Sequence, residues 1–151
     1  MSISKFSVSG LDSLINSLSA VCTNVNKVVE EGLLKGAMLI QNSAKYHCPV
    51  DTGALRNSIV ITPIESGFDI GSILEYAEAV EYGTGSLGDP SVSHTTKEKW
   101  VYYNPLTKEY KTAYPQKPRP FMYPALQENK LNVEICVKES IVKRLKEAVK
   151  W

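Results

Sequence analysis

The sequence predicts an α+β fold in a single domain. Three observations support this: an apolar stripe at helical spacing over residues 21–46, two hairpin patterns over residues 55–73 and 100–112, and a second helical stripe after residue 123. Helices precede and follow the strands instead of alternating with them, which is typical of the α+β class. We therefore expect a long N-terminal helix and a C-terminal helix packed on a small, mainly antiparallel sheet with two β-hairpins.

The N-terminal third predicts a short strand followed by two helices. Alternating apolar and polar residues at 3–9 indicate an edge strand, which Ser9-Gly10 ends. Residues 11–18 carry apolar side chains at the spacing of a short amphipathic helix. A separate, longer helix is expected over residues 21–46, where one apolar stripe runs through the segment.

Three small or cyclic residues shape this longer helix. Gly32 and Gly36 lie in its stripe, and each weakens the helix by about 1 kcal/mol relative to alanine. Small residues four apart also permit close packing against another element. Pro49 is expected to stop the helix, because its ring disfavours helical geometry in Cys48.

The middle of the chain predicts a hairpin and a short helix. Residues 55–64 are rich in β-branched side chains, and a Ser-Gly turn separates them from a second alternating run at 68–73. Residues 76–82 form a short helical pattern that Gly83 closes. Residues 85–97, rich in Gly, Ser, Thr and Asp, are expected to form a flexible loop.

A second hairpin and a final helix complete the chain. Residues 100–103 and 109–112 flank a turn at 104–108. Four prolines then indicate an extended link over residues 115–124. A helix is expected from about Tyr123 to Val149, with one apolar stripe along its later part.

The composition restricts the classes of function. The 151 residues fit one domain, and the 17 basic and 16 acidic residues leave a net charge of +1. This balance gives no overall attraction to nucleic acid or to an anionic membrane. The three cysteines include no CxxC pair, the N-terminus lacks a signal-peptide pattern, and no stretch approaches a membrane span. We expect a protein made in the cytoplasm, with reduced thiols.

The segment Asp51-Thr52-Gly53-Ala54 has two incompatible interpretations. Aspartic proteases carry this signature in a loop, where two carboxylates share a proton and activate water, and a short retroviral-type chain supplies one aspartate per subunit. In such enzymes an apolar strand leads into the motif, whereas a helix with polar residues leads in here. The second signature of those enzymes, an apolar pair before Gly-Arg-Asp or Gly-Arg-Asn, is absent.

The alternative is a structural turn, and the sequence favours it. Asp and Thr side chains accept hydrogen bonds from nearby backbone amides, and Gly53 permits a positive φ. These residue types suit a chain that must reverse from a helix to a strand within a few residues. No catalytic residue, cofactor site or metal site is therefore assigned, and the chain is expected not to be an enzyme.

The sequence gives only weak evidence for a nucleotide-binding or metal-binding site. Residues 83–88 match GxGxxG, but no strand precedes them and no helix follows, as a dinucleotide site requires. His47 and His94 lie apart in the sequence. His47-Cys48 with Cys22 would make only a chance metal site, and a helix-end histidine is the simpler interpretation.

Two surfaces have both a structural and a functional interpretation. The aromatic side chains of the second hairpin either pack across the strands over the core or anchor another subunit. The candidate interface residues are Trp100, Tyr102, Tyr103 and Tyr110. The basic residues near the C-terminus either form a solvated helix face or make weak contact with DNA. These are Lys138, Lys143, Arg144, Lys146 and Lys150.

With these elements in order, nearly the whole chain resembles the tail-completion, or neck, family of long-tailed bacteriophages. Three segments carry the resemblance: PVDTGALRNSI at 49–59, YAEAVEYGT at 76–84, and RPFMYPAL at 119–126. A Gly-Leu-Asp at 10–12, opening the first helix, is also similar to the family. Each segment alone is modest, and their order makes the set fairly specific.

The resemblance implies one domain over residues 1–151 that serves as a structural virion protein. It implies a homo-oligomeric ring between the portal or head-completion proteins and the tail terminator or tail tube, with DNA passing nearby and no membrane. A tail terminator or another minor tail subunit is the alternative. The positions expected to determine the fold are Pro49, Asp51, Thr52, Gly53, Leu55, Arg56, Tyr76, Ala77, Glu81, Gly83, Thr84, Pro120, Phe121 and Pro124. Among them, Arg56 and Glu81 are expected to pair as opposite charges.

Overall fold

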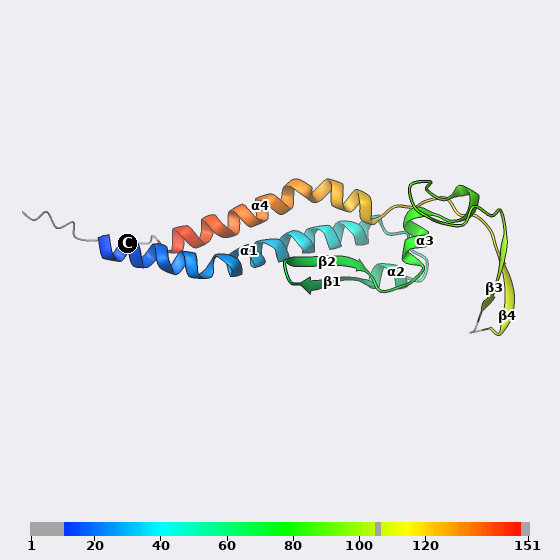
Figure 1. Ribbon diagram of the computed structural model, residues 1–151, viewed down its shortest axis with the longest axis horizontal. Helices are drawn as coiled ribbons and strands as arrows, with labels where there is room; N and C mark the ends of the chain where they lie inside the picture. The colour runs from blue at the N-terminus through cyan, green and yellow to red at the C-terminus, as the bar shows by residue number, and fades with distance from the viewer. Residues whose placement is uncertain (1–10, 105–106, 149–151) are drawn as a thin grey trace, which may run out of the picture.

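The computed structural model describes residues 11–104 and 107–148, with side chains of the first helix described at Ser19 and from Val25 onward. The molecule is elongated (Figure 1). Helix α1 (Leu11–His47) and helix α4 (Met122–Ala148) lie side by side along the long axis. The expected strand at residues 3–9 lies outside the described residues. The α+β class is confirmed.

Helix α1 is a single helix, and the expectation of separate helices at 11–18 and 21–46 was wrong. The residues between them, Ser19 and Ala20, carry no proline or glycine that would interrupt the backbone hydrogen bonds. The far end of α1 is as expected. The Cys48 amide still bonds to the Ala44 carbonyl at 2.9 Å, and Pro49 lies outside the helix.

The two glycines of α1 form the closest approach between the long helices. A Cβ atom on Gly32 would lie 2.6 Å from the Cα of Val137, and one on Gly36 would lie 2.8 Å from a methyl group of Val133. No side chain larger than hydrogen fits at such a crossing. The small residues four apart therefore serve the close packing that the sequence predicts.

The first hairpin covers the side of α1 opposite to α4 (Figure 1). Strand β1 (Ile59–Ile64) pairs antiparallel with β2 (Gly67–Ser72), with Ile61 opposite Ile70. The strand expected from Leu55 onward begins later, because one helical turn, α2 (Ala54–Asn57), comes first. This turn buries Leu55 against the core.

The second hairpin does not join the first in one sheet. Strands β3 (Trp100–Asn104) and β4 (Glu109–Ala113) form their own two-stranded sheet, so the expected small sheet is two separate hairpins in the described chain. Between the hairpins lie α3 (Ala77–Tyr82) and the short 3-10 turn η1 (Gly85–Leu87). The β3–β4 hairpin projects beyond the end of the helix pair (Figure 1).

The core is small and lies where α1 ends, α2 turns and α4 begins. Its largest fully buried side chains are Phe121 and Ile59, each 1% exposed. Ile40, Leu55 and Ala125 complete the same cluster. Segments that are far apart in the sequence thus meet at one place, and the residues from the three phage-like segments lie around it.

Candidate functional site

The carboxylate of Glu81 joins two of the phage-like segments. Glu81 lies in the last turn of α3 and is 6% exposed. Its oxygens accept hydrogen bonds from the backbone N–H groups of Phe121, Met122 and Tyr123, at 2.7, 3.0 and 2.9 Å. These are free amides at the start of α4, where a helix favours a negative charge. Glu81 therefore caps α4 from a distant part of the chain.

This geometry corrects the expected Arg56–Glu81 pair. Arg56 is exposed at the end of α2, and the salt bridges of the described residues do not include it. The sequence does indicate that the start of α4 lacks a local cap. The residues before α4, Pro118 to Phe121, contain no Ser, Thr, Asp or Asn that would cap the helix locally. A missing local cap leaves these amides open to an acceptor from elsewhere in the chain, and Glu81 is that acceptor.

The chain after α3 crosses the link before α4 at close range. Thr84 and Gln116 form an antiparallel bridge, with N–O distances of 2.9 and 3.1 Å. Gly83 has a φ of +73°, and a Cβ there would lie 2.5 Å from the Gln116 carbonyl oxygen. The Arg119 amide donates to the Val80 carbonyl at 2.8 Å. The second and third phage-like segments are thus held together by backbone contacts.

The Asp-Thr-Gly segment forms the bend between α1 and α2. Gly53 has a φ of +82°, and its carbonyl accepts the Asn57 amide at 3.0 Å. The Thr52 hydroxyl oxygen accepts the Ala54 amide at 3.4 Å. Asp51 is exposed. The positive φ and the local hydrogen bonds have the geometry of a turn that connects two helices.

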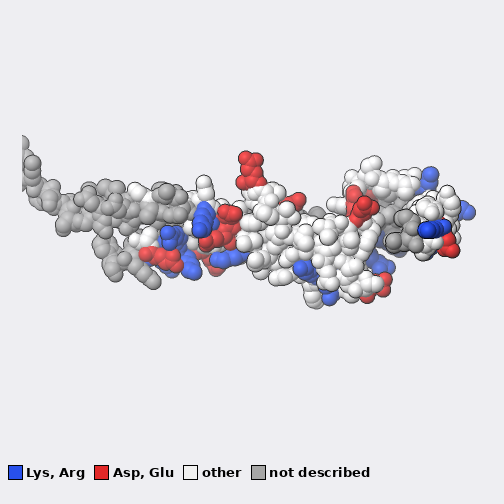
Figure 2. All heavy atoms as spheres, turned by 90° about the horizontal axis from the view of Figure 1, so that it is seen from below, with Lys and Arg blue, Asp and Glu red and all other residues white. Residues whose placement is uncertain are grey.

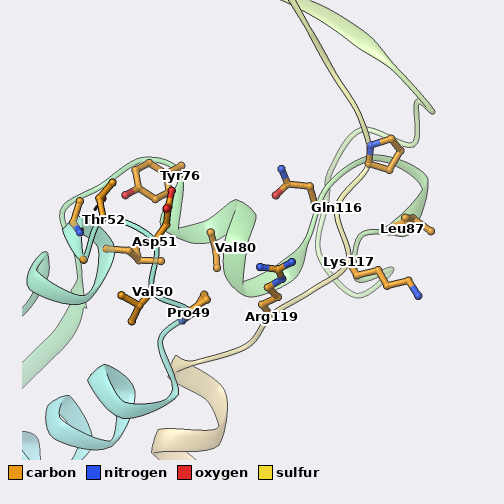
Figure 3. A pocket seen from close by; sticks show the side chains of 14 residues that line it. Pro49, Val50, Asp51, Thr52, Tyr76, Val80, Leu87, Gln116, Lys117 and Arg119 are labelled. Carbon is orange, nitrogen blue, oxygen red and sulfur yellow. Dashed lines mark hydrogen bonds between the residues drawn. The ribbon is translucent and has the colours of Figure 1, made fainter.

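A groove of about 660 Å³ opens beside this bend (Figure 3). One wall is the turn from Pro49 to Leu55, with Tyr76 near Asp51, and the opposite wall is formed by Leu87 and residues 115–117. Arg119 lies beside Val80 between the two walls. Asp51 is the one carboxylate among the lining residues, whereas Lys117 and Arg119 are cationic.

The β3–β4 hairpin exposes most of its aromatic side chains. Tyr103 and Tyr110 are opposite each other in the register and make an edge-to-face contact with ring centroids 5.3 Å apart. Alternation places Tyr103 and Tyr110 on one face with Val101 and Thr112, which leaves that face without charge. Tyr110 remains 77% exposed. The hairpin does not cover the core, so packing over the core does not explain these side chains.

Trp100 and Tyr102 share the opposite face of the hairpin, as the alternation predicts. Trp100 is half-buried and Tyr102 is exposed. Lys111 and Glu109 lie on the same face, so this side is polar. The four candidate interface residues are therefore divided between two faces of one projecting element.

The thiols and histidines have structural surroundings. Burial raises the pKa of the Cys48 thiol, which the nearby Arg56 charge partly opposes. His47 binds the Glu128 carboxylate at 2.9 Å, and the Ser43 hydroxyl donates to it at the same distance. These bonds, the histidine first, lower the pKa of Glu128. In the described residues, no three His, Cys, Asp or Glu side chains gather as metal ligands.

The basic residues near the C-terminus alternate with acids. Lys138 lies 3.9 Å from Glu134, and Arg144 lies 3.6 Å from Glu147. On the face shown in Figure 2, charges of both signs are mixed along the helix pair. Among the described residues, neither long helix has the uncharged apolar length that a bilayer span requires.

Comparison with protein families matches residues 12–83 to the model described as "Bacteriophage HK97-gp10, putative tail-component". The match includes α1, the Asp-Thr-Gly bend, the first hairpin and α3, and it ends at Gly83. Neither the curated proteins nor the solved structures give a match to this chain. Residues 12–83, just under half of the chain, are thus similar to a bacteriophage family that is described as a putative tail component.

Proposed function

We propose that this chain is a tail-completion, or neck, component that joins the head connector to the tail as an oligomeric ring. The observation that carries the proposal is that all three phage-like segments meet around one joint, by which we mean the contact of Glu81 and Val80 of α3 with residues 119–123 at the start of α4. Glu81 from the second segment binds the start of the third, and the first lines the adjoining groove. The contacts between the segments support a shared arrangement of α3, the Asp-Thr-Gly bend and the start of α4. The family match supports a role in the phage tail.

The joint separates the packed helices from a projecting element. On one side lie α1, α4 and the first hairpin, and on the other the β3–β4 hairpin with its exposed tyrosines (Figure 1). Exposed aromatic side chains on a projecting element are typical anchors for a neighbouring subunit. The partners we propose are further copies of the chain, the portal or head-completion proteins, and the tail terminator or tail tube. The site of action is then the virion.

The exposed position of Asp51 supports a role other than catalysis. In a protease dyad, the two carboxylates must approach closely and be shielded so that they share one proton. Asp51→Asn should therefore leave casein digestion unchanged, with pepstatin as the inhibitor control. Digestion that pepstatin blocks and Asp51→Asn abolishes would replace the proposal with an aspartic protease.

The decisive experiment is deletion of the gene from a phage or prophage, followed by electron microscopy of the particles. A neck component predicts DNA-filled heads beside detached tails. The full chain supplied in trans should restore joined particles, and the Tyr103→Ser/Tyr110→Ser variant should restore fewer. Tails of uncontrolled length would instead favour the tail-terminator role. Normal particles without the protein would reject both.

A further inference from the structure

The outward face of α4 carries a row of large aliphatic side chains in contact with solvent. Leu131 is 70% exposed, Ile135 48%, Val142 46% and Leu145 39%. Their spacings of four, seven and three residues place them on one side of a helix that turns by about 100° per residue. Lys138 occupies the missing position of this repeat. We call these four aliphatic residues and Lys138 the outer stripe.

The outer stripe does not face α1. The stripe that faces α1 contains Asn129, Val133, Val137 and Ser140, where the valines meet the two glycines of α1. Leu131 lies two residues from both Asn129 and Val133, which is about half a turn away. The first hairpin lies beyond α1, on the far side from α4 (Figure 1).

The single apolar stripe expected for this helix is therefore two stripes on opposite faces. The internal contact is made by two valines together with the buried polar residues Asn129 and Ser140, while the larger leucine and isoleucine side chains of the outer stripe remain outside. A helix that packs on one neighbour normally shows the opposite distribution. The exposed aliphatic face of α4 is therefore a candidate surface for contact with a second molecule.

The charges beside the outer stripe are complementary to those of a second copy in antiparallel orientation. A two-fold axis between residues 136 and 137 sets Leu131 opposite Val142 of the second copy. The same axis brings Glu134 beside Lys138 of the second copy, twice in the symmetric pair. A parallel pairing would bring Glu134 against Glu139 instead, with like charges in contact.

The side chains involved are available for this contact. Glu134 and Lys138 form only a long intrahelical pair of 3.9 Å, and their side chains are 56% and 74% exposed. Helices that pair about a two-fold axis bury the same patch on both chains, so each favourable contact occurs twice.

We propose that two copies of this chain associate through antiparallel packing of the outer stripes of α4. The contact is isologous and leaves the β3–β4 hairpin and the groove free. It goes beyond the proposed ring, which needs a head-to-tail contact on other surfaces, and it does not depend on the neck assignment.

The test is sedimentation of the full-length chain over a wide concentration range, with circular dichroism to show that each variant is folded. The wild type should form a dimer. Leu131→Ser/Ile135→Ser should weaken association by about a hundredfold or more, because both chains lose apolar burial. Ile73→Ser is the matched control, since Ile73 is 75% exposed but lies away from α4.

Charge reversal tests the register. Glu134→Lys and Lys138→Glu should each weaken the homodimer by about tenfold, because like charges then meet across the axis. An equal mixture of the two variants should dimerise again, since each chain supplies the charge that the other lacks. The intrahelical pair is lost in both variants, so it does not explain recovery on mixing.

Three outcomes would reject the antiparallel contact. A wild type that stays monomeric at every concentration rejects the proposal, as does a dimer or larger assembly that keeps its size in Leu131→Ser/Ile135→Ser. Charge variants that fail to recover on mixing also reject the antiparallel contact. Because the readout is association in solution, it is independent of whether particles lacking the protein have detached tails.

Discussion

The joint at the start of α4 and the β3–β4 hairpin are neighbours along the chain, yet they differ in almost every physical respect. At the joint, the Glu81 carboxylate is buried and accepts three amide hydrogen bonds. In the hairpin, the strands pair with each other, and Tyr103 and Tyr110 are exposed. An isolated two-stranded hairpin is only marginally stable in water.

The joint and the hairpin therefore differ in what their residues contact. Residues at the joint are fixed by the fold, because each meets a specific backbone group at short range. The tyrosines of the hairpin lie away from the core and are exposed, and we propose that they contact another subunit. The predictions below test this division, from the largest expected effect to the smallest.

Replacement of Glu81 should be the most damaging change. Glu81→Ala leaves the amides of Phe121, Met122 and Tyr123 without their acceptor, and we expect a loss of about 3 kcal/mol or more in the free energy of unfolding. Urea denaturation measures this loss. Glu78→Ala, an exposed carboxylate on the same helix, should change the value by less than about 0.5 kcal/mol. Equal effects would show that Glu81 is not a cap.

The two glycines with positive φ in the phage-like segments should respond unequally. Gly83→Ala adds a Cβ 2.5 Å from the Gln116 oxygen, whereas Gly53→Ala meets nothing closer than 3.9 Å. We expect about 2–3 kcal/mol of destabilisation at Gly83 and about 1 kcal/mol at Gly53, where only the backbone strain applies. Thermal unfolding of both variants checks the order. A larger effect at Gly53 would contradict the close crossing.

Gly32→Ala should loosen the packing of α1 on α4. The added methyl group gains about 1 kcal/mol in helix propensity but collides with the Val137 backbone, so we expect a net loss of about 1–2 kcal/mol. Gly71→Ala is the control, because its Cβ meets nothing within 4 Å. Chemical denaturation distinguishes the two. A stabilised Gly32→Ala protein would mean that the helices separate easily.

Removal of the hairpin tyrosines should leave the fold intact. Tyr103→Ser/Tyr110→Ser is expected to change the free energy of unfolding by less than about 1 kcal/mol, because the two rings contact each other and both are exposed to solvent. The same variant should lower the yield of joined particles in the complementation experiment. If it unfolds the protein, the hairpin belongs to the core and the comparison fails.

Acidification should weaken the contact between the helices at Glu128. Its pKa in the folded protein lies below the ordinary value of 4.5, so the stability it contributes is complete above that pH and is lost as the pH falls through the folded value. Because Glu128 is exposed, the effect should be small. Glu128→Gln should remove this part of the pH dependence of thermal unfolding, and an unchanged acid limb would argue against the His47 contact.

Much of the fold was predictable because it depends on local patterns. The end of α1 just before Pro49, the turn around Gly53 and both hairpins follow from residue type and alternation. The break expected near residue 20 was wrong because a change in the apolar pattern does not interrupt a backbone that has no glycine or proline there. The first strand began late because the turn after Gly53 continued for one helical turn.

The site was predictable only in part. The sequence singled out Arg56, Glu81 and Gly83, but it paired the first two by charge. The partner of Glu81 proved to be the backbone at the start of α4, about 40 residues later in the chain. A charged side chain can be identified from its residue type alone. Free backbone amides at a helix start can be inferred from a sequence only where no residue that could cap the helix precedes it.

The sequence by itself determined the class of the fold, the ends of the helices and the residues that bend the chain, because these depend on propensity and spacing along a few turns. Only the tertiary structure decided that Glu81 caps α4, that the two hairpins stay apart, and that α4 turns its aliphatic side chains outward. Each of these depends on which surfaces meet, and that is settled by packing between segments far apart in the chain.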